Sequence, residues 1–476
     1  MRLKSLRALA LCGTILLAAT ACSHQNRMKP IVAAYEAGNF AAAGESLAPL
    51  LADRRDSEKD RTLYELEAGA VYMASGDLAK ASASLDEADE RMWRYLDDAP
   101  EIRVSEQAAA ILSNQTVITY FGRPHDRIMC STYKGLNRIL ANDLGNAGVP
   151  FRRAYEWQQD AYQKHASEIA ELERKSDEAA QSNGYDAKRA AEDPRFKQSS
   201  ESAYGPLRAL TGYGEFEIPY STFLRALHHR LMAGASDLEQ ATAAFRRVAG
   251  MLPEADRAPI LADAQATEDG MGGKAIPPTV HVVFESGMAP WLDELRLDIP
   301  LFMQKVPYVG AAFPILKQKD GAPAGFRIRG SGQEPQSAVL LTDMDRVIGD
   351  DFNRRLPAII TMTLVSSATK AIATYIAQEA ASQQNSNAAL MIAIGGAIYQ
   401  VATNSADLRT WLTLPKHVYY GRIAAPADGS IEIELGDGQR IGPIPVESNG
   451  ATIVHLRTPR IGVPPAVRSA RFPEAG

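Results

Sequence analysis

Cysteine is scarce in this chain, and that scarcity excludes a disulfide-stapled scaffold. The 476 residues include three cysteines, too few for the several crosslinks that hold small secreted domains together. Excess positive charge is also missing, because the formal net charge is −6. Since nucleic-acid binding requires a basic surface, this charge argues against a general nucleic-acid-binding protein.

Familiar catalytic and metal-binding motifs are missing as well. The sequence contains neither a His-Glu-x-x-His zinc motif nor a Gly-x-Ser-x-Gly nucleophile elbow. His228 and His229 are adjacent, so on a helix they would point about 100° apart and would not clamp one metal ion. The run Gly272-Gly273-Lys274 lacks the Ser or Thr that follows the lysine of a phosphate-binding loop. We therefore predict no catalytic residue, no metal site and no cofactor.

The composition is that of a folded, globular chain. Hydrophobic residues make up 46% of the sequence and charged residues 23%. At roughly 150 residues per domain, this length suggests two or three domains.

The first 22 residues predict export and lipidation. A basic start (Arg2, Lys4 and Arg7) precedes the apolar stretch 8–19, which is too short to span a membrane stably. The Ala-Thr-Ala-Cys run that ends at Cys22 resembles the lipobox of bacterial lipoproteins. That resemblance implies removal of residues 1–21 and acylation of Cys22. The alternative is ordinary secretion with Cys22 incidental.

The resemblance also implies a location. Ser23 occupies the position where an aspartate would signal retention in the inner membrane. We therefore expect an outer-membrane lipoprotein that faces the periplasm, tethered through residues 22–30 by the acyl chains on Cys22. The remaining cysteine, Cys130, lies among apolar neighbours and is expected to be a small core residue.

Residues 31–254 predict a solenoid of helix pairs. Small and large residues around position 69 are spaced as two antiparallel helices require, with a turn at Gly76-Asp77. The pattern resembles the tetratricopeptide repeat, a helix–turn–helix unit of roughly 34 residues that leaves a concave, protein-binding face. The residues expected to pack the repeats are Gly69, Tyr72, Ala81, Leu85 and Ala88, then Gly135, Ala147, Phe151 and Ala154, then Ala241 and Phe245.

Two segments interrupt or follow this pattern. The polar stretch 155–202 suggests a helix or helical hairpin that projects from the solenoid, and we favour a solvated, charged surface there. The glycine- and proline-containing stretch 255–278 is expected to be a linker.

The remainder, 279–463, predicts a mainly antiparallel, sandwich-like β domain, so the fold class is α+β. Ile431, Ile433 and Leu435 alternate with glutamates, as in a sheet with one wet face. The expected strands cover 279–284, 326–329, 337–341, 418–423, 430–435 and 451–456, and a tail follows over 464–476.

A helical hairpin over 354–402 is expected to interrupt these strands. Its first helix should begin near Pro357, and its second, 388–399, is apolar but short of the roughly 20 residues that cross a bilayer. We favour a hairpin buried against the sheet over one that contacts a partner or a membrane. Asp407, Arg409 and Trp411 follow it; we favour a structural ion pair there over a ligand pocket.

Segments 114–157, 284–290 and 407–415 together resemble a family of tetratricopeptide-repeat-containing bacterial lipoproteins. That resemblance implies a periplasmic accessory protein and carries over no catalytic residue. The first hypothesis is a lipid-anchored adaptor that binds envelope proteins, in envelope assembly or cell-wall synthesis. The alternative is a glycan- or peptidoglycan-acting enzyme with its site in the C-terminal domain. A third is a complex subunit that uses 356–402 for oligomerisation or bilayer contact.

Overall fold

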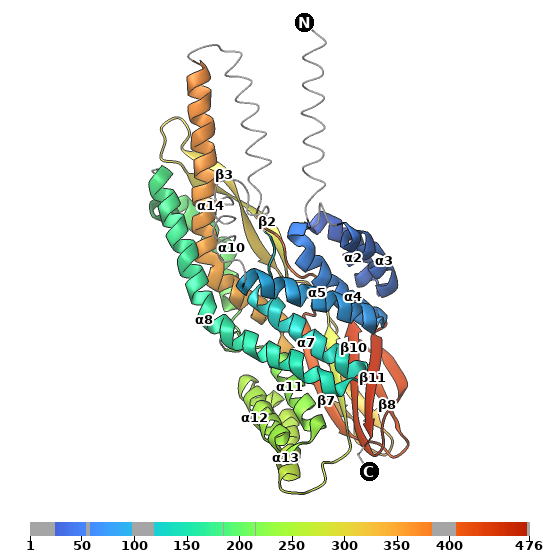
Figure 1. Ribbon diagram of the computed structural model, residues 1–476. Coiled ribbons are helices and arrows are strands. Elements are labelled where there is room, and N and C mark those ends of the chain that lie inside the picture. The colour runs from blue at the N-terminus through green and yellow to red at the C-terminus, as the bar shows by residue number, and fades with distance from the viewer. Residues whose placement is uncertain are drawn as a thin grey trace.

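The structure is a computed structural model that describes residues 24–53, 58–97, 119–183, 185–214, 216–382 and 406–473. Helices occupy the first half of the chain and strands most of the second, which makes the fold α+β as predicted (Figure 1). Cys22, the export segment and the apolar run 388–399 lie outside the described residues.

The helical half consists of helices that pack against their neighbours in the chain. In order they are α2 (His24–Glu36), α3 (Phe40–Ala52), α4 (Arg61–Ser75), α5 (Leu78–Asp97), α7 (Pro124–Leu140), α8 (Leu144–Asn183), α9 (Ala187–Ala191), α10 (Pro194–Tyr204), α11 (Pro219–Met232), α12 (Ala235–Met251) and α13 (Ala258–Met271). Three of the contacting pairs are α4 with α5, α7 with α8, and α11 with α12. Short turns join the members of each pair; Gly76, for example, ends α4 with a φ of 89° that favours glycine.

Close approach within two of these pairs depends on glycine. A Cβ atom added at Gly69 would lie 2.4 Å from the Leu85 side chain, and one added at Gly135 would lie 2.5 Å from the Phe151 ring. Because glycine carries only a hydrogen atom in place of a side chain, α4 can approach α5, and α7 can approach α8, this closely.

Two sheets follow, together with a separate hairpin. The larger sheet has the order β11-β10-β1-β7-β6, the smaller has the order β5-β4-β8-β9, and β2 pairs with β3. Strands β1 and β10 are parallel, whereas the other pairs are antiparallel. The strands are β1 (Thr279–Ser286), β2 (Trp291–Pro300), β3 (Tyr308–Lys317), β4 (Phe326–Gly330), β5 (Gln336–Ser337), β6 (Val339–Asp343), β7 (His417–Ala424), β8 (Ser430–Leu435), β9 (Arg440–Pro445), β10 (Gly450–Thr458) and β11 (Ala466–Pro473).

The larger sheet is buried on both faces. Side chains alternate along β1, so Val280, Val282 and Phe284 pack on the smaller sheet while Val283 faces the helices. The protein therefore has three layers: helices, the five-stranded sheet and the four-stranded sheet. The predicted alternation in β8 is confirmed, because Ile431, Ile433 and Leu435 are buried while Glu432 is exposed.

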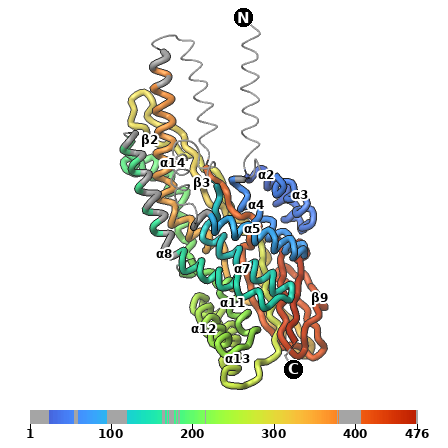
Figure 2. Tube along the Cα trace, viewed as in Figure 1, coloured from blue at the N-terminus to red at the C-terminus, as the bar shows by residue number. Residues whose placement is uncertain are grey.

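An arm extends beyond these layers (Figures 1 and 2). It consists of α14 (Met344–Ser382), much of α8, the short helices α9 and α10, and the β2–β3 hairpin. A small core of its own, which includes Phe196, Phe313 and Leu364, holds these elements together. Within the described residues, the segment Met344–Ile376 of α14 is long and apolar enough to cross a membrane, but 56% of its most apolar stretch is buried inside the protein.

Several boundaries differ from the sequence predictions. Helix α14 begins at Met344 rather than near Pro357, which lies inside it. The predicted linker contains α13, the predicted tail contains β11, and the strand expected at 337–341 is divided between β5 and β6. Strands β2, β3 and β9 were not predicted. The stretch 155–202, expected to form a projecting helix or helical hairpin with a solvated face, contains much of α8 together with α9 and α10, and α8 packs along α14 in the arm.

Candidate functional site

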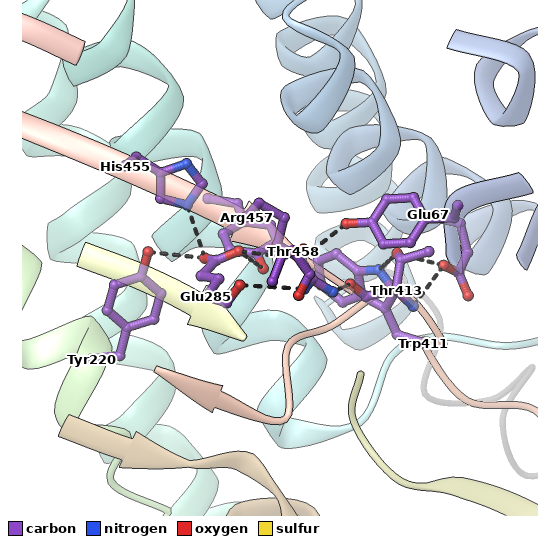
Figure 3. Close-up of polar contacts among 10 residues, drawn as sticks. Glu67, Tyr220, Glu285, Trp411, Thr413, His455, Arg457 and Thr458 are labelled. Atoms are coloured by element: carbon purple, nitrogen blue, oxygen red, sulfur yellow. Dashed lines mark hydrogen bonds and ion pairs between the residues drawn. The ribbon is translucent and has the colours of Figure 1, made fainter. Parts of the chain in front are cut away.

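The face of the larger sheet that meets the helices carries charged residues. Glu285 of β1 and Arg457 of β10 are each 2% exposed and lie at the centre of the first cluster (Figure 3). The hydroxyls of Tyr220 and Tyr133 donate to the two oxygens of Glu285 at 2.9 and 3.1 Å. His455 Nε2 lies 3.4 Å from the same carboxylate.

The charges of this cluster compensate one another. Burial alone would raise the pKa of Glu285, but His455 and Arg457 outweigh it and hold that pKa below its usual range. Arg457 also donates to the Tyr35 hydroxyl at 3.0 Å and to the Thr413 carbonyl at 3.2 Å. One arginine thus links β10 to α2 and to the loop before β7.

Glu67 of α4 forms a second contact between the helices and that loop. Its carboxylate, fully buried, accepts from the backbone N–H groups of Leu412 and Thr413 at 2.6 and 3.1 Å, and from the Thr413 hydroxyl at 2.6 Å. Burial raises the pKa of Glu67 to about 7, against the lowering effect of those hydrogen bonds. Trp411 Nε1 donates to the same hydroxyl at 3.0 Å, which completes a buried chain of donors (Figure 3).

A third cluster joins α13 to the sheet. Asp263, fully buried, pairs with Arg230 of α11 at 2.7 Å and with Arg422 of β7 at 2.9 Å. It also accepts from the Tyr420 hydroxyl, which lies 2.8 Å from Nδ1 of His281. Burial and the two arginines hold the pKa of His281 well below its ordinary value, so this imidazole is neutral at neutral pH.

These three clusters attach the helical layer to the sheet. Their carboxylates are between 0% and 2% exposed, and their oxygens are occupied by hydroxyl, backbone or arginine donors. Such groups stabilise the fold and define the packing, because removing one partner would leave a buried charge uncompensated. They do not meet a dissolved substrate.

An open groove lies elsewhere, where α11 forms a floor between α8 and α12. Its volume is about 280 Å³. Residues at helical spacing line it from each side, because positions three or four apart share one face. They are Tyr155, Gln158 and Gln159 from α8, Thr222 and Arg225 from α11, Gln240, Ala243, Ala244 and Arg247 from α12, and Glu217 just before α11.

The polar groups of the groove are held in place by one another. Gln158 accepts from the Ile218 N–H at 2.9 Å, and Arg247 forms an ion pair with Glu217. The Arg225 guanidinium stacks over the Tyr155 ring at 4.4 Å and donates to Gln240 at 3.2 Å. The alanines of α12 leave the hollow open. A groove of this kind is suited to binding a side chain of another molecule.

A second cavity, lined by His125 and Asp351 among others, has a volume of only about 10 Å³. That is space for roughly one water molecule. His125 lies 3.5 Å from both Asp126 and Asp351, so these residues interact with one another inside the protein.

The structure places the predicted packing residues in the helical layer. Ten of them are buried, and Tyr72 is half-buried with its hydroxyl 3.4 Å from the Gly44 carbonyl. The buried ones are Gly69, Ala81, Leu85, Ala88, Gly135, Ala147, Phe151, Ala154, Ala241 and Phe245. Cys130 of α7 is fully buried, as expected for a core residue.

The geometry of Asp407, Arg409 and Trp411 favours the structural alternative. Arg409 pairs with Asp407 at 2.8 Å and with Asp60, just before α4, at 3.1 Å. Trp411 is fully buried and packs edge-on against Tyr133. These side chains fasten the loop before β7 to the helical layer.

The groove residues were not singled out by sequence reasoning. Tyr155, Arg225 and Gln240 belong to three helices, and only their packing brings them together. The sequence pattern that could have indicated the groove is the pair of polar residues at 240 and 247, which lie on one face of α12. In the described ranges, no group of three or more His, Cys, Asp or Glu residues is arranged to hold a metal ion.

No protein-family model, curated protein or solved structure matches this chain.

Proposed function

We propose that this protein is a lipid-anchored adaptor that binds a partner protein of the bacterial envelope. Acyl chains on Cys22 would hold it at the periplasmic face of the outer membrane, and a tetratricopeptide-like helical layer would present the partner-binding surface. Envelope assembly and cell-wall synthesis are processes that such an adaptor would serve.

The observation that carries this proposal is the groove formed by α8, α11 and α12. It combines an aromatic ring, two arginines and two exposed glutamines, Gln159 and Gln240, on packed helices. Aromatic and arginine side chains dominate the binding energy of protein interfaces. Its volume of about 280 Å³ falls just below the roughly 300–1,000 Å³ of small-molecule sites. A groove of this size can accommodate a projecting side chain of a partner protein.

The enzyme alternative would require an accessible acid with a raised pKa in the C-terminal half. Asp345 has a raised pKa because of burial, which Lys416 opposes. However, it is only 1% exposed, and its carboxylate accepts from Lys416 and Gln318. This acid is engaged inside the fold, so the adaptor is the function that the geometry supports better.

Site-specific photo-crosslinking in cells tests the proposal. A photoreactive amino acid replaces Gln159, which is exposed in the groove. The control replaces Gln198, a glutamine on α10 that is also exposed. We expect one or two envelope proteins to be crosslinked from position 159 and not from position 198. We also expect the Cys22→Ala form to leave the membrane fraction and to lose those crosslinks. Equal labelling from both positions, or none from position 159, would contradict the adaptor.

A further inference from the structure

Arg225 occupies an unusual electrostatic position. It is half-buried on the floor of the groove, and its contacts are the Tyr155 ring at 4.4 Å and the amide oxygen of Gln240 at 3.2 Å. Among the residues that the structure describes, no carboxylate lies within ion-pair distance of it. Burial lowers the pKa of Arg225, and Tyr155 only partly opposes that effect.

Another arginine of the same helix gives the contrast. Arg230 is 5% exposed, and Asp263 neutralises it at 2.7 Å. Arg247 on the groove wall likewise has Glu217 as its partner. Charges that leave water are normally paired inside proteins. Arg225 therefore has the features of a cation that is neutralised by the negative charge of a bound ligand.

The surroundings favour an anion as well. Arg225 and Arg247 contribute two positive charges to the lining and Glu217 one negative charge, which leaves a net charge of +1 in a chain of net charge −6. The planar guanidinium presents paired N–H donors that match the two oxygens of a carboxylate. The Tyr155 ring and the Ala244 methyl group supply apolar surface for the aliphatic part of an acidic side chain.

We propose that the groove binds an acidic peptide segment of the partner, with a glutamate or aspartate carboxylate of that segment seated on the Arg225 guanidinium. This inference rests on the proposed adaptor function and specifies the partner chemistry. The Arg225 guanidinium lies over the Tyr155 ring at 4.4 Å and donates to Gln240 at 3.2 Å. The side chain is thus positioned before the ligand arrives, which reduces the ordering required on binding.

A fluorescent peptide assay with the full chain in detergent tests this chemistry. The probe is a labelled ten-residue peptide amide with two central glutamates, and its partner probe carries glutamines instead. We expect the glutamate peptide to bind at least about tenfold more tightly, which is the effect of one hydrogen-bonded charge pair. Equal affinity for both peptides would overturn the inference, as would full displacement by inorganic phosphate at equimolar concentration, which would indicate a general anion site.

Two variants assign the effect to Arg225. Arg225→Met keeps the length and removes the charge, and Arg225→Lys keeps the charge and removes the planar fork. We expect about tenfold weaker binding of the glutamate peptide to the methionine variant, an intermediate loss for the lysine variant, and an unchanged or higher melting temperature for both. The matched control is Arg195→Met, because Arg195 stacks on Tyr308 at 5.0 Å outside the groove. Unchanged peptide binding by both Arg225 variants would overturn the inference.

The crosslinking experiment separates this inference from the function on which it rests. If the Gln159 crosslinks form with undiminished yield in the Arg225→Met background, the adaptor function stands and the acidic-peptide inference fails. If no crosslink forms from position 159 in the unmodified background, the adaptor function itself fails.

Discussion

Replacing Glu67 by glutamine should change how the stability of the protein depends on pH. The pKa of this carboxyl is about 7 in the folded protein and 4.5 in the unfolded reference, because burial penalises the charged form. Between these values, the folded protein binds a proton that the unfolded chain does not. The free energy of unfolding therefore decreases as the pH rises from about 4.5 through 7.

The size of the effect follows from the shift. At about 1.4 kcal/mol per pKa unit, the raised pKa of Glu67 contributes on the order of 3 kcal/mol to the free energy of unfolding. This contribution is present in acid and is lost above pH 7. Glu67→Gln is neutral at all pH values and lacks this contribution. However, its amide presents N–H donors to the Thr413 N–H, where the carboxylate accepts at 3.1 Å. That mismatch should cost about 1–3 kcal/mol.

Urea unfolding of both proteins between pH 5 and pH 8.5 measures this difference. We expect the stability advantage of the unmodified protein over Glu67→Gln to shrink by roughly 3 kcal/mol across that range. The control is Glu90→Gln, which removes an exposed pair with Arg94 and should change stability by less than about 1 kcal/mol at any pH. An advantage that stays constant with pH would refute the argument that burial of Glu67 dominates its titration.

Two further substitutions test the packing and the buried charges. Gly135→Ala places a methyl group 2.5 Å from an aromatic ring of α8 and should destabilise the protein by about 1–3 kcal/mol. Gly145→Ala, also in α8, meets nothing within 4 Å and should be neutral or slightly stabilising in the same melting experiment. Asp263→Asn leaves Arg230 buried without its carboxylate and should cost about 3–5 kcal/mol in urea unfolding; a loss below 1 kcal/mol would contradict the assigned pairing.

The sequence predicts two local features of this fold directly. Pairs such as Gly69 with Leu85 lie one helical hairpin apart, so local spacing is enough to predict their contact. Strand β8 shows its two faces directly in the alternation of isoleucine and glutamate. Both signals are short-range and need no knowledge of the remaining chain.

The missed elements have physical reasons. Helix α13 buries Asp263 and Thr267 together with Ile260 and Ala264, so half of its inner face is polar and its apolar period is weak. The inner end of α14 was missed because Pro357 resembles a helix start, whereas here the helix continues through it.

The buried polar clusters were not predicted, because polar residues in a strand can face either solvent or a covering layer of helices. His281 and Glu285 lie on one face of β1, four residues apart, and His455 and Arg457 occupy alternate positions of β10. Polar residues on alternate positions usually indicate a face in water. Here that face is covered by helices from the other half of the chain, which no local pattern reveals. The groove was missed for the related reason that three separate helices build it.

The hydrogen bond between Arg457 and Tyr35 has a consequence for the order of folding. It joins residues 422 positions apart, and Gln25, also in α2, donates to the Leu408 carbonyl across 383 positions. Helix α2 therefore cannot complete this packing until β10 has been synthesised. Contacts between residues so far apart in the sequence slow folding, because the entropy cost of closing the loop comes before the contact contributes favourable free energy. We therefore expect α2 to complete its contacts with the carboxy-terminal half late in folding.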